Sequence, residues 1–408
     1  MADSTSPVKL LARVFSAQES GLTLVIVLMM IVLTLFGGTK LKLNRVDVGA
    51  DETITLYDHA GHAHEAGALA DRDIARAVVT APDGTERVFT GELGYREARG
   101  QRFLVVKREV NKFLELENII LVMTSASFIA VMAVGMTAVI ILAGIDLSVG
   151  SIYAIAAIVG AIALHELGTE AGVVSSVGLG LAVTLVVGGL CGLANGVMIV
   201  GLRVHPFVIT LGMMAALRGL TIIIPQKIYS EQSIGAFSPA FTSGFFKKEY
   251  AGVYPVPTII MLLVALAGWF VLSRTVLGRR VFAIGGNETA ARYAGIPVGR
   301  VKIIVYTVMG VLAGLSACIY LGYYGSAETS AGTAYELKVI AAAVIGGASL
   351  MGGRGSAMGA VLGAIVIQLI DNAMIIFEID QSWNQVVMGA AIIVAVVIDQ
   401  AKRRIASG

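Results

Sequence analysis

Long apolar runs separated by short polar segments dominate the chain from residue 113 onward, and one further run lies near its start. A helix needs about 20 consecutive apolar residues to cross the hydrocarbon core of a bilayer. By this criterion the pattern predicts about ten membrane-spanning helices, over residues 19–38, 117–143, 148–165, 174–200, 204–224, 254–273, 302–323, 335–351, 356–377 and 383–399. We therefore expect an all-α polytopic membrane protein.

Residues 39–112 interrupt this pattern, because they are polar and charged and contain strand-like pieces. The runs TITLYD (53–58) and ARAVVTAPDGTERVFTG (75–91) are rich in residues that favour strands. Pro82-Asp83-Gly84 supplies turn chemistry between two such runs, so we expect a hairpin there. The pattern predicts four parts: residues 1–38 with the first span, a β-rich insertion at 39–112, a transmembrane domain at 113–400 and a tail at 401–408.

The composition supports the membrane class. Of the 408 residues 56% are hydrophobic and only 14% are charged, with a mean hydropathy of +0.82. An ordinary soluble domain carries about 25% charged residues. The net charge of +2 gives no reason to expect a nucleic-acid partner. The 48 glycines suit helices packed closely in a bilayer.

The distribution of basic residues predicts the orientation, because cytoplasmic loops of membrane proteins carry an excess of Lys and Arg. If the N-terminus is cytoplasmic, the inside segments carry Lys9, Arg13, Arg203, Arg274, Arg279, Arg280, Arg292, Arg300, Lys302, Arg354, Lys402, Arg403 and Arg404. The short outside loops then carry Lys227, Lys247 and Lys248. This bias places both termini in the cytoplasm and the insertion outside. The first apolar run, 21–37, lacks a cleavage site and is expected to stay as a span.

Few residues offer metal or thiol chemistry. Cys191 and Cys318 lie in apolar segments, so we expect buried thiols without a disulfide. His59, His62 and His64 cluster in the insertion, where they could bind a transition metal. A polar turn between strands is the interpretation we favour, and no metal site is predicted.

Asp146 lies in the stretch AGIDLSVGS (143–151), between two apolar runs. An ionisable residue within a membrane segment is a functional candidate. Its position just before a predicted helix also suits a structural role, in which the carboxylate accepts from N–H groups of the first turn near the cytoplasmic surface. We favour this capping role over direct contact with a substrate.

A polar, basic loop at 274–302 contains a short predicted helix. Asn287 should break the chain, residues 288–294 should be helical, and Gly295 with Pro297 should end the helix. The alternative is an ordinary basic loop that obeys the charge rule. We favour a docking element for a soluble cytoplasmic partner.

The sequence carries no recognisable catalytic motif. The glycine-rich stretch VIGGASLMGGRGS (344–356) is not followed by the Lys-Ser or Lys-Thr of a phosphate-binding loop. No HExxH, GxSxG or CxxC motif occurs. We expect a protein that is not an enzyme and that binds no cofactor itself.

Four motifs together resemble a known family. They are AGIDLSVGS (143–151), NGVMIVGLRVHPFVITLG (195–212), GRRVFAIGGNETAARYAGI (278–296) and ELKVIAAAVIGGASLMGGRGS (336–356). The chain is similar to the permease subunits of bacterial ABC importers for monosaccharides, the ribose, xylose and arabinose permeases. The resemblance covers residues 113–400 and the first span, whereas the family usually has a short connection in place of 39–112.

This resemblance implies a type II ABC importer fold in the inner membrane. It implies a second permease subunit, most simply a second copy, together with a cytoplasmic ATPase dimer that binds ATP and Mg, and a periplasmic sugar-binding protein. The segment 287–295 matches the family's coupling helix, which implies ATPase contact by Asn287, Glu288, Ala291, Arg292 and Gly295. Asp146, Ser148 and Ser151 match a family signature.

Polar side chains at membrane depth are candidates for the sugar pathway, and they are Asn195, Thr210, Gln368 and Asn372. Each could equally bond between helices. Alternatives stay open for the cargo (an autoinducer, a nucleoside or an amino acid) and for the class (an ion-coupled secondary transporter or a sensor). A charged cargo would favour charge in the pathway, where only Asp146, Glu336 and Asp371 are available.

Overall fold

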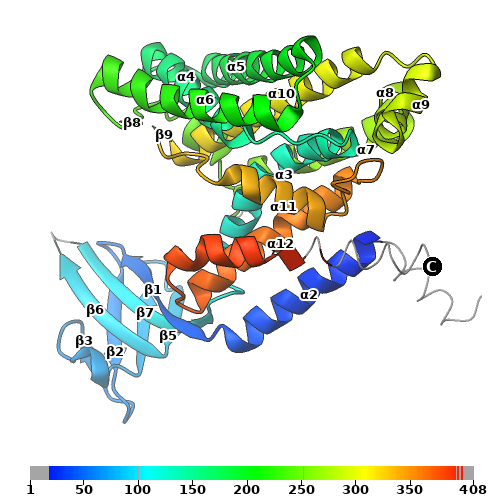
Figure 1. The fold of residues 1–408 in the computed structure, drawn as a ribbon. Coiled ribbons are helices and arrows are strands. Elements are labelled where there is room, and N and C mark those ends of the chain that lie inside the picture. Colours follow the sequence, from blue (N-terminus) through cyan, green and yellow to red (C-terminus); the bar gives the residue numbers. More distant parts are fainter. Residues whose placement is uncertain (1–17, 99–100, 251, 392, 395–396, 398–408) are drawn as a thin grey trace, which may run out of the picture. The chain divides into compact units, whose positions relative to one another are not determined.

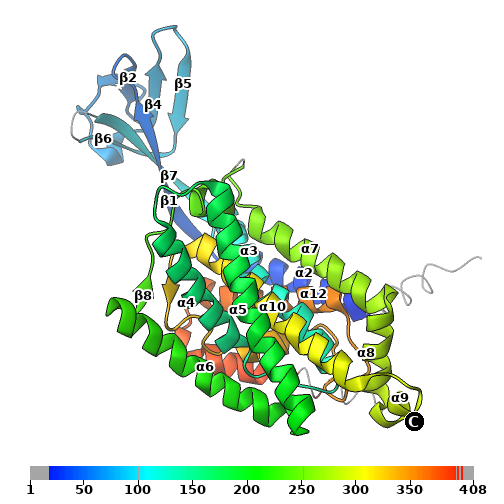
Figure 2. The same ribbon diagram turned by 90° about the horizontal axis from the view of Figure 1, so that it is seen from above.

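The computed structural model describes residues 18–98, 101–250, 252–391, 393–394 and 397. The predicted tail at 401–408 and the first 17 residues lie outside these. The chain divides into two compact units, residues 32–118 and residues 1–31 with 119–408. Figures 1 and 2 show their ribbons from two sides.

Helices make up most of the larger unit. The long ones are α2 (Gln18–Phe36), α3 (Leu116–Ile141), α4 (Val149–Leu167), α5 (Val173–Leu202), α6 (Pro206–Tyr229), α7 (Val256–Arg274), α10 (Val298–Tyr324) and α12 (Ala357–Ile376). The shorter ones are α8 (Val276–Gly286), α9 (Glu288–Tyr293) and α11 (Tyr335–Ile345), and a two-stranded ribbon joins β8 (Ser233–Ile234) to β9 (Ala327–Glu328). Within the described residues, eight helices are long and apolar enough to cross a membrane.

The structure corrects the expectation of ten full-length helices at one place. The helix expected over 335–351 ends at Ile345, and its 11 residues span about 16 Å, half of a hydrocarbon core. Residues 346–356 are irregular. The last predicted span, 383–399, lies partly outside the described residues, and its residues 384–391 are helical.

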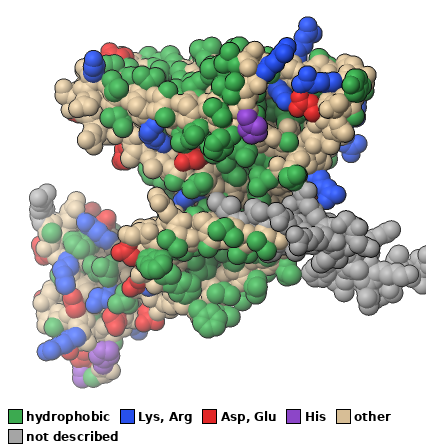
Figure 3. Space-filling model, in the orientation of Figure 1, with side chains coloured by type: hydrophobic (Ala, Val, Ile, Leu, Met, Phe, Trp, Pro, Cys, Tyr) green, Lys and Arg blue, Asp and Glu red, His purple; other side chains and the backbone are tan. Residues whose placement is uncertain are grey.

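Burial separates central from peripheral helices. In the most apolar window of α3 78% of the residues are buried, against 17% in α6. Apolar side chains that are exposed on a helix of this length suit contact with lipid. Figure 3 shows hydrophobic side chains spread over the face of the larger unit that it presents. The core of the unit therefore lies around α3 and α4.

Helices α5 and α10 form the most extensive helix contact and lie side by side in Figure 2. Glycines allow it: a Cβ placed on Gly310 would lie 2.1 Å from the carbonyl oxygen of Gly188. Gly192 and Gly314 are packed against backbone in the same way. Small residues at such a contact let two backbones approach closely in a membrane. Cys318 on α10 is a free, buried cysteine, and Cys191 on α5 is free and partly buried.

In the smaller unit, the residues that the structure describes form seven strands in two sheets. They are β1 (Thr39–Val48), β2 (Thr53–Tyr57), β3 (Ala63–Glu65), β4 (Arg76–Thr80), β5 (Glu86–Thr90), β6 (Glu92–Ala98) and β7 (Gln101–Asn111). The sheet orders are β1-β7-β6 and β3-β2-β4-β5, with antiparallel pairing throughout. The predicted hairpin at Pro82–Gly84 is confirmed, since β4 pairs with β5 there. Leu56, Ala77 and Leu104 lie in the core of this unit.

Candidate functional site

The break between α3 and α4 is built around Asp146. Ala143 adopts a left-handed conformation with φ of 57°, which ends α3 and turns the chain. The Oδ1 atom of Asp146 accepts from the backbone N–H of Ser148 at 2.9 Å and from the Ser148 hydroxyl at 2.6 Å. Ser148, not Asp146, is the N-cap residue of α4, and Asp146 is fully buried. The expectation of bonds to N–H groups of the first turn of α4 is thus wrong, because the carboxylate of Asp146 bonds the N-cap residue Ser148 instead. Its position near the cytoplasmic surface stays a prediction.

Residues from three segments meet at this break. The side-chain amide of Asn195 on α5 donates to the Ser148 hydroxyl at 2.8 Å. The Thr210 hydroxyl on α6 donates to the Ile145 carbonyl over a long 3.5 Å. Ser151 is buried one turn into α4. The structure therefore brings Asp146 and Ser148 together with Asn195 and Thr210, two of the four pathway candidates, and Ser151 follows them in the first turn of α4.

Three side-chain oxygens of this cluster stay without a hydrogen bond among the described residues, Oδ2 of Asp146, Oγ of Ser151 and Oδ1 of Asn195. Buried polar atoms without partners are costly, so they persist where packing fixes them. Asn195 links α5 to the turn before α4. The cluster therefore holds α5 against the break between α3 and α4.

The other two pathway candidates lie elsewhere, on α12. The amide of Gln368 donates to Asp371 at 3.2 Å, and the ammonium group of Lys338 on α11 pairs with the same carboxylate at 2.7 Å. Asn372 is buried beside them. Sequence reasoning missed this ion pair, although a lysine and an aspartate in neighbouring apolar segments were a usable signal.

The short helix α9 forms as predicted. The side chain of Asn287 caps it by accepting from the Ala290 N–H at 2.9 Å, and Gly295 ends it with φ of 80°. Ala291 points into the protein and is buried. We note that the neighbouring Tyr293 is 90% exposed. One face of α9 thus packs against the protein through Ala291, and the face that carries Tyr293 is exposed.

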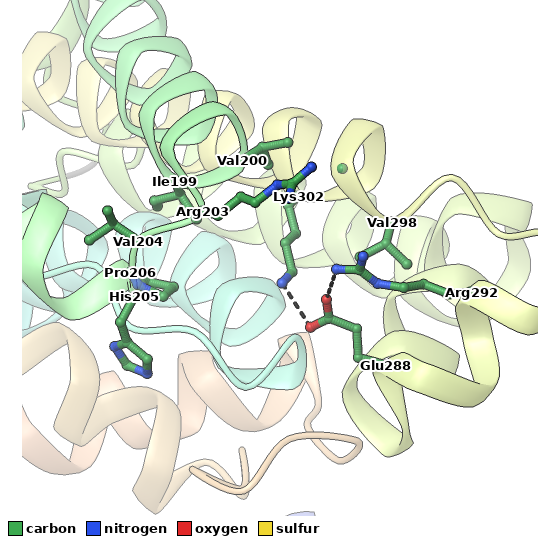
Figure 4. Close-up of a pocket in the computed structure, with 11 residues that line it drawn as sticks. Ile199, Val200, Arg203, Val204, His205, Pro206, Glu288, Arg292, Val298 and Lys302 are labelled. Carbon is green, nitrogen blue, oxygen red and sulfur yellow. Dashed lines mark hydrogen bonds and ion pairs between the residues drawn. The ribbon is translucent and has the colours of Figure 1, made fainter.

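Glu288 ties α9 to the bundle. Its carboxylate pairs with Lys302 on α10 at 2.8 Å and with Arg292 at 2.6 Å (Figure 4). Partial burial acts to raise the pKa of Glu288, but the hydrogen bonds from Lys302 and Arg292 outweigh it, and the pKa lies below its ordinary value. Glu288 therefore stays ionised at neutral pH.

A hollow of about 810 Å³ opens beside this ion-pair network. Its walls come from the end of α5, the start of α6, α9 and the start of α10, and the residues are Ile199, Val200, Arg203, Val204, His205, Pro206, Glu288, Arg292, Val298, Gly299 and Lys302 (Figure 4). Lysine and arginine side chains gather at the end of the unit that carries α8 and α9 (Figure 3). Sequence reasoning missed Arg203 and His205 as part of this surface, because they are far from α9 in the sequence.

The histidine cluster of the smaller unit is organised by Asp58. Its carboxylate accepts from the backbone N–H groups of Ala60 and His62 at 2.9 Å each and lies 3.0 Å from a ring nitrogen of His64. These hydrogen bonds lower the pKa of Asp58, and the bond from His64 has the largest effect. Within the described residues no three His, Cys, Asp or Glu side chains are placed to hold a metal ion.

Comparison with known proteins places most of the helical part, from α3 onward, in one family. Residues 118–396 match the family described as "branched-chain amino acid transport system / permease component". The chain is 38% identical to the ribose import permease RbsC of Escherichia coli K12 over 291 residues, which are 71% of this chain and 88% of the relative. It is 37% identical to the D-allose permease AlsC of the same strain, over 71% of this chain and 85% of the relative. It is 33% identical to the xylose permease XylH of that strain, over 72% of this chain and 87% of the relative. No solved structure matches the chain.

Proposed function

Because this chain belongs to the family of branched-chain amino acid transport system permease components, we propose that it is the membrane-spanning subunit of an ATP-driven importer that carries a monosaccharide. The observation that supports the sugar is the similarity to ribose, allose, xylose and fructose permeases along most of their length.

The partners follow from the chemistry of the chain. It contains no phosphate-binding loop, so ATP and its Mg²⁺ belong to a separate ATPase dimer. We assign docking of that ATPase to α9, with Asn287, Glu288, Ala291, Arg292 and Gly295, and to the hollow beside it. A second copy of the chain completes the pathway, and a periplasmic binding protein delivers the sugar.

The order of the elements supports ten crossings of the inner membrane with both termini in the cytoplasm. Residues 325–356, which contain the half-length helix α11, lie between α10 and α12 in the chain. We count this segment as one crossing, which brings the chain back from the outer to the cytoplasmic side. The helical residues 384–391 begin the last crossing. The β-rich unit, between α2 and α3, then lies outside, where a long loop crosses irrespective of its charge.

Transport proceeds by alternating access. ATP binding draws the ATPase subunits together, and their movement is passed to the bundle through α9. Since Glu288 pairs with Lys302, a displacement of α9 acts directly on the start of α10. Helix α10 is in turn packed along α5, so both move as one body.

The rival cargoes differ in charge. An amino acid, as named in the description of the family, carries charges that a pathway must pair. Asp146 is enclosed in the helix break and Asp371 is paired with Lys338. Glu336 is the remaining carboxylate of the three, and it could pair only the ammonium group of a zwitterion. A neutral sugar, which needs hydrogen bonds alone, fits better. Membership of the family also argues against an ion-coupled secondary transporter.

Purification of the tagged chain from its host in mild detergent tests the proposal. We expect an ATPase subunit to co-purify and the preparation to hydrolyse ATP. A Tyr293→Cys variant, whose side chain is 90% exposed on α9, should crosslink to that subunit. Isolation of the chain alone, with no crosslinked ATPase, would contradict it.

A further inference from the structure

Two interruptions of the helical bundle meet beside α4. Helix α4 begins at Val149, and the irregular residues 329–334 lead into α11. A Cβ placed on Gly150 would lie 2.6 Å from the carbonyl oxygen of Gly332, and one on Gly332 would lie 2.4 Å from that of Gly150. The two backbones therefore touch, which only glycine permits at Gly332, where φ is +69°.

This contact lies deep in the bundle. Gly160 of α4 packs against Leu321 near the outer end of α10. Gly150 precedes it by ten residues, and a helix rises 1.5 Å per residue, so the contact lies about 15 Å deeper, near the middle of a bilayer core. In secondary transporters, interrupted helices at the midplane leave polar backbone free to bind the substrate, and the same physical reason applies to an interruption at this depth here.

Tyrosines line the approach to this contact. The ring of Tyr153 lies 5.6 Å from that of Tyr320 and 5.3 Å from that of Tyr335, and Tyr320 lies 4.9 Å from Tyr324. Tyr153 is fully buried, Tyr320 and Tyr335 are partly exposed, and Tyr324 is 52% exposed. The cluster thus leads from the surface to the break. Ring faces carry negative potential, which suits the C–H groups on the face of a sugar ring.

Polar groups of the cluster are left to bind a ligand. The hydroxyl of the fully buried Tyr153 faces the side chain of Tyr335 and makes no hydrogen bond within 3.5 Å to a described residue. Glu336, in the first turn of α11, is partly exposed and forms no ion pair with a described residue. The nearby Arg218 donates to the Ala331 carbonyl at 2.8 Å and attracts Glu336 without forming a direct ion pair with it. A partly exposed intramembrane carboxylate without a direct ion pair is a candidate for a substrate path.

We propose that Tyr153, Tyr320, Tyr335 and Glu336 form the site that holds the sugar during its passage through the membrane. The rings stack on the C–H face of a pyranose, and the Tyr153 hydroxyl and the Glu336 carboxylate bond its hydroxyl groups. This site deepens the proposed function and rests on it. A belt of tyrosines at the membrane surface does not explain the cluster, because Tyr153 is buried beside the helix break.

Uptake and ATP hydrolysis measured together test the site. The assembled importer, purified with its ATPase and binding protein, is placed in lipid vesicles and given radiolabelled D-ribose, D-allose, D-xylose or D-fructose. Tyr153→Phe and Glu336→Gln should each lower the sugar carried per ATP about five-fold, the effect of one lost hydrogen bond. Tyr229→Phe is the matched control, because it removes a tyrosine hydroxyl that bonds Glu166 outside the cluster.

The outcomes separate the two proposals. Uptake by the wild type with an unchanged ratio in Tyr153→Phe and Glu336→Gln overturns the site and leaves the proposed function standing. A proportional fall in uptake and in ATP hydrolysis also overturns it, since this indicates a structural role. Hydrolysis of ATP without uptake of any of the four sugars by the wild type overturns the proposed function, and the site with it.

Discussion

The side-chain amide of Asn195 donates to the hydroxyl of Ser148 at 2.8 Å, and this one bond ties α5 to the break before α4. The Ser148 hydroxyl donates in turn to Asp146, so that three buried side chains form a chain of hydrogen bonds. These bonds hold α5 at the interruption before α4, which accounts for the polar side chains of Asp146 and Ser148 in structural terms.

Substitution of Asp146 tests this role. Asp146→Asn keeps an acceptor oxygen for Ser148, whereas Asp146→Ala leaves the buried N–H and hydroxyl of Ser148 without it. An unsatisfied buried polar group costs about 1–3 kcal/mol. We expect the alanine variant to unfold at a clearly lower temperature in detergent, and the asparagine variant to stay near the wild type. Equal loss in both would indicate that the charge itself is required.

Reversal of the charge of Glu288 tests the coupling surface. Glu288→Lys puts a third cation beside Arg292 and Lys302, so we expect loss of sugar uptake and of the co-purified ATPase, with normal insertion into the membrane. Glu170→Lys, at an exposed position in the turn before α5, is the control. Undiminished uptake by Glu288→Lys would remove α9 from the mechanism.

The same ion pairs predict a pH dependence. The pKa of Glu288 is lowered, so its pairs are complete above the usual range of a glutamate and are lost only as the pH falls through the lowered value. The amount of ATPase that co-purifies should therefore be the same at pH 7 and at about pH 5, since both lie above the ordinary pKa of a glutamate. A decline within this range that Glu288→Gln abolishes would contradict the lowered pKa.

Close packing of α5 against α10 predicts an asymmetry between glycines. Gly310→Ala would place a Cβ 2.1 Å from the Gly188 carbonyl oxygen, so the helices must separate and the protein should lose stability. In α6, a Cβ on Gly219 would meet nothing within 4 Å. Gly219→Ala should be neutral or slightly stabilising, because alanine favours a helix. Size-exclusion chromatography after heating measures the unfolding temperature of each variant. Equal unfolding temperatures for Gly310→Ala and Gly219→Ala would contradict the close packing of α5 against α10.

In the β-rich unit, Glu115 joins β1 to the segment before α3. Its carboxylate pairs with Lys40 at 2.5 Å and with Lys42 at 2.8 Å, and these bonds lower its pKa. The stabilisation is therefore present above the usual glutamate pKa and is lost as the pH falls through the lowered one.

We expect Glu115→Gln to speed hydrogen exchange in β1 at neutral pH, as measured by mass spectrometry of the full chain. Glu117→Gln is the control, because Glu117 is exposed and contacts Lys42 alone. Similar exchange in both variants would show that Glu115 does not hold β1.

Hydropathy predicted most of the helices because it measures the length of an apolar run, and length decides whether a helix can cross a bilayer. It could not detect the early end of α11. That helix stops where Gly346 packs against the backbone of Gly359, and apolar residues continue beyond it. The side of the membrane on which residues 39–112 lie stays a prediction.

Candidate residues were predicted more reliably than their contacts. Asp146, Ser148 and Asn195 were each identifiable as polar groups among apolar ones, but Asn195 lies 47 positions from Ser148 and only packing brings them together. The positions of Arg203 and His205 beside α9, in the wall of the hollow, could not be predicted for the same reason. Spacing along the chain indicates local turns and caps, and it does not give the neighbours across a helix bundle.

Accumulation of sugar in sealed vesicles tests whether this chain is the membrane subunit of an ATP-driven sugar importer. The purified complex, with ATP on the side of the ATPase and sugar-loaded binding protein on the other, should concentrate labelled D-ribose or one of the related sugars. Accumulation should stop when ATP is replaced by an analogue that cannot be hydrolysed, and should continue when a protonophore removes the proton gradient. Accumulation that depends on an ion gradient and proceeds without ATP would contradict the account.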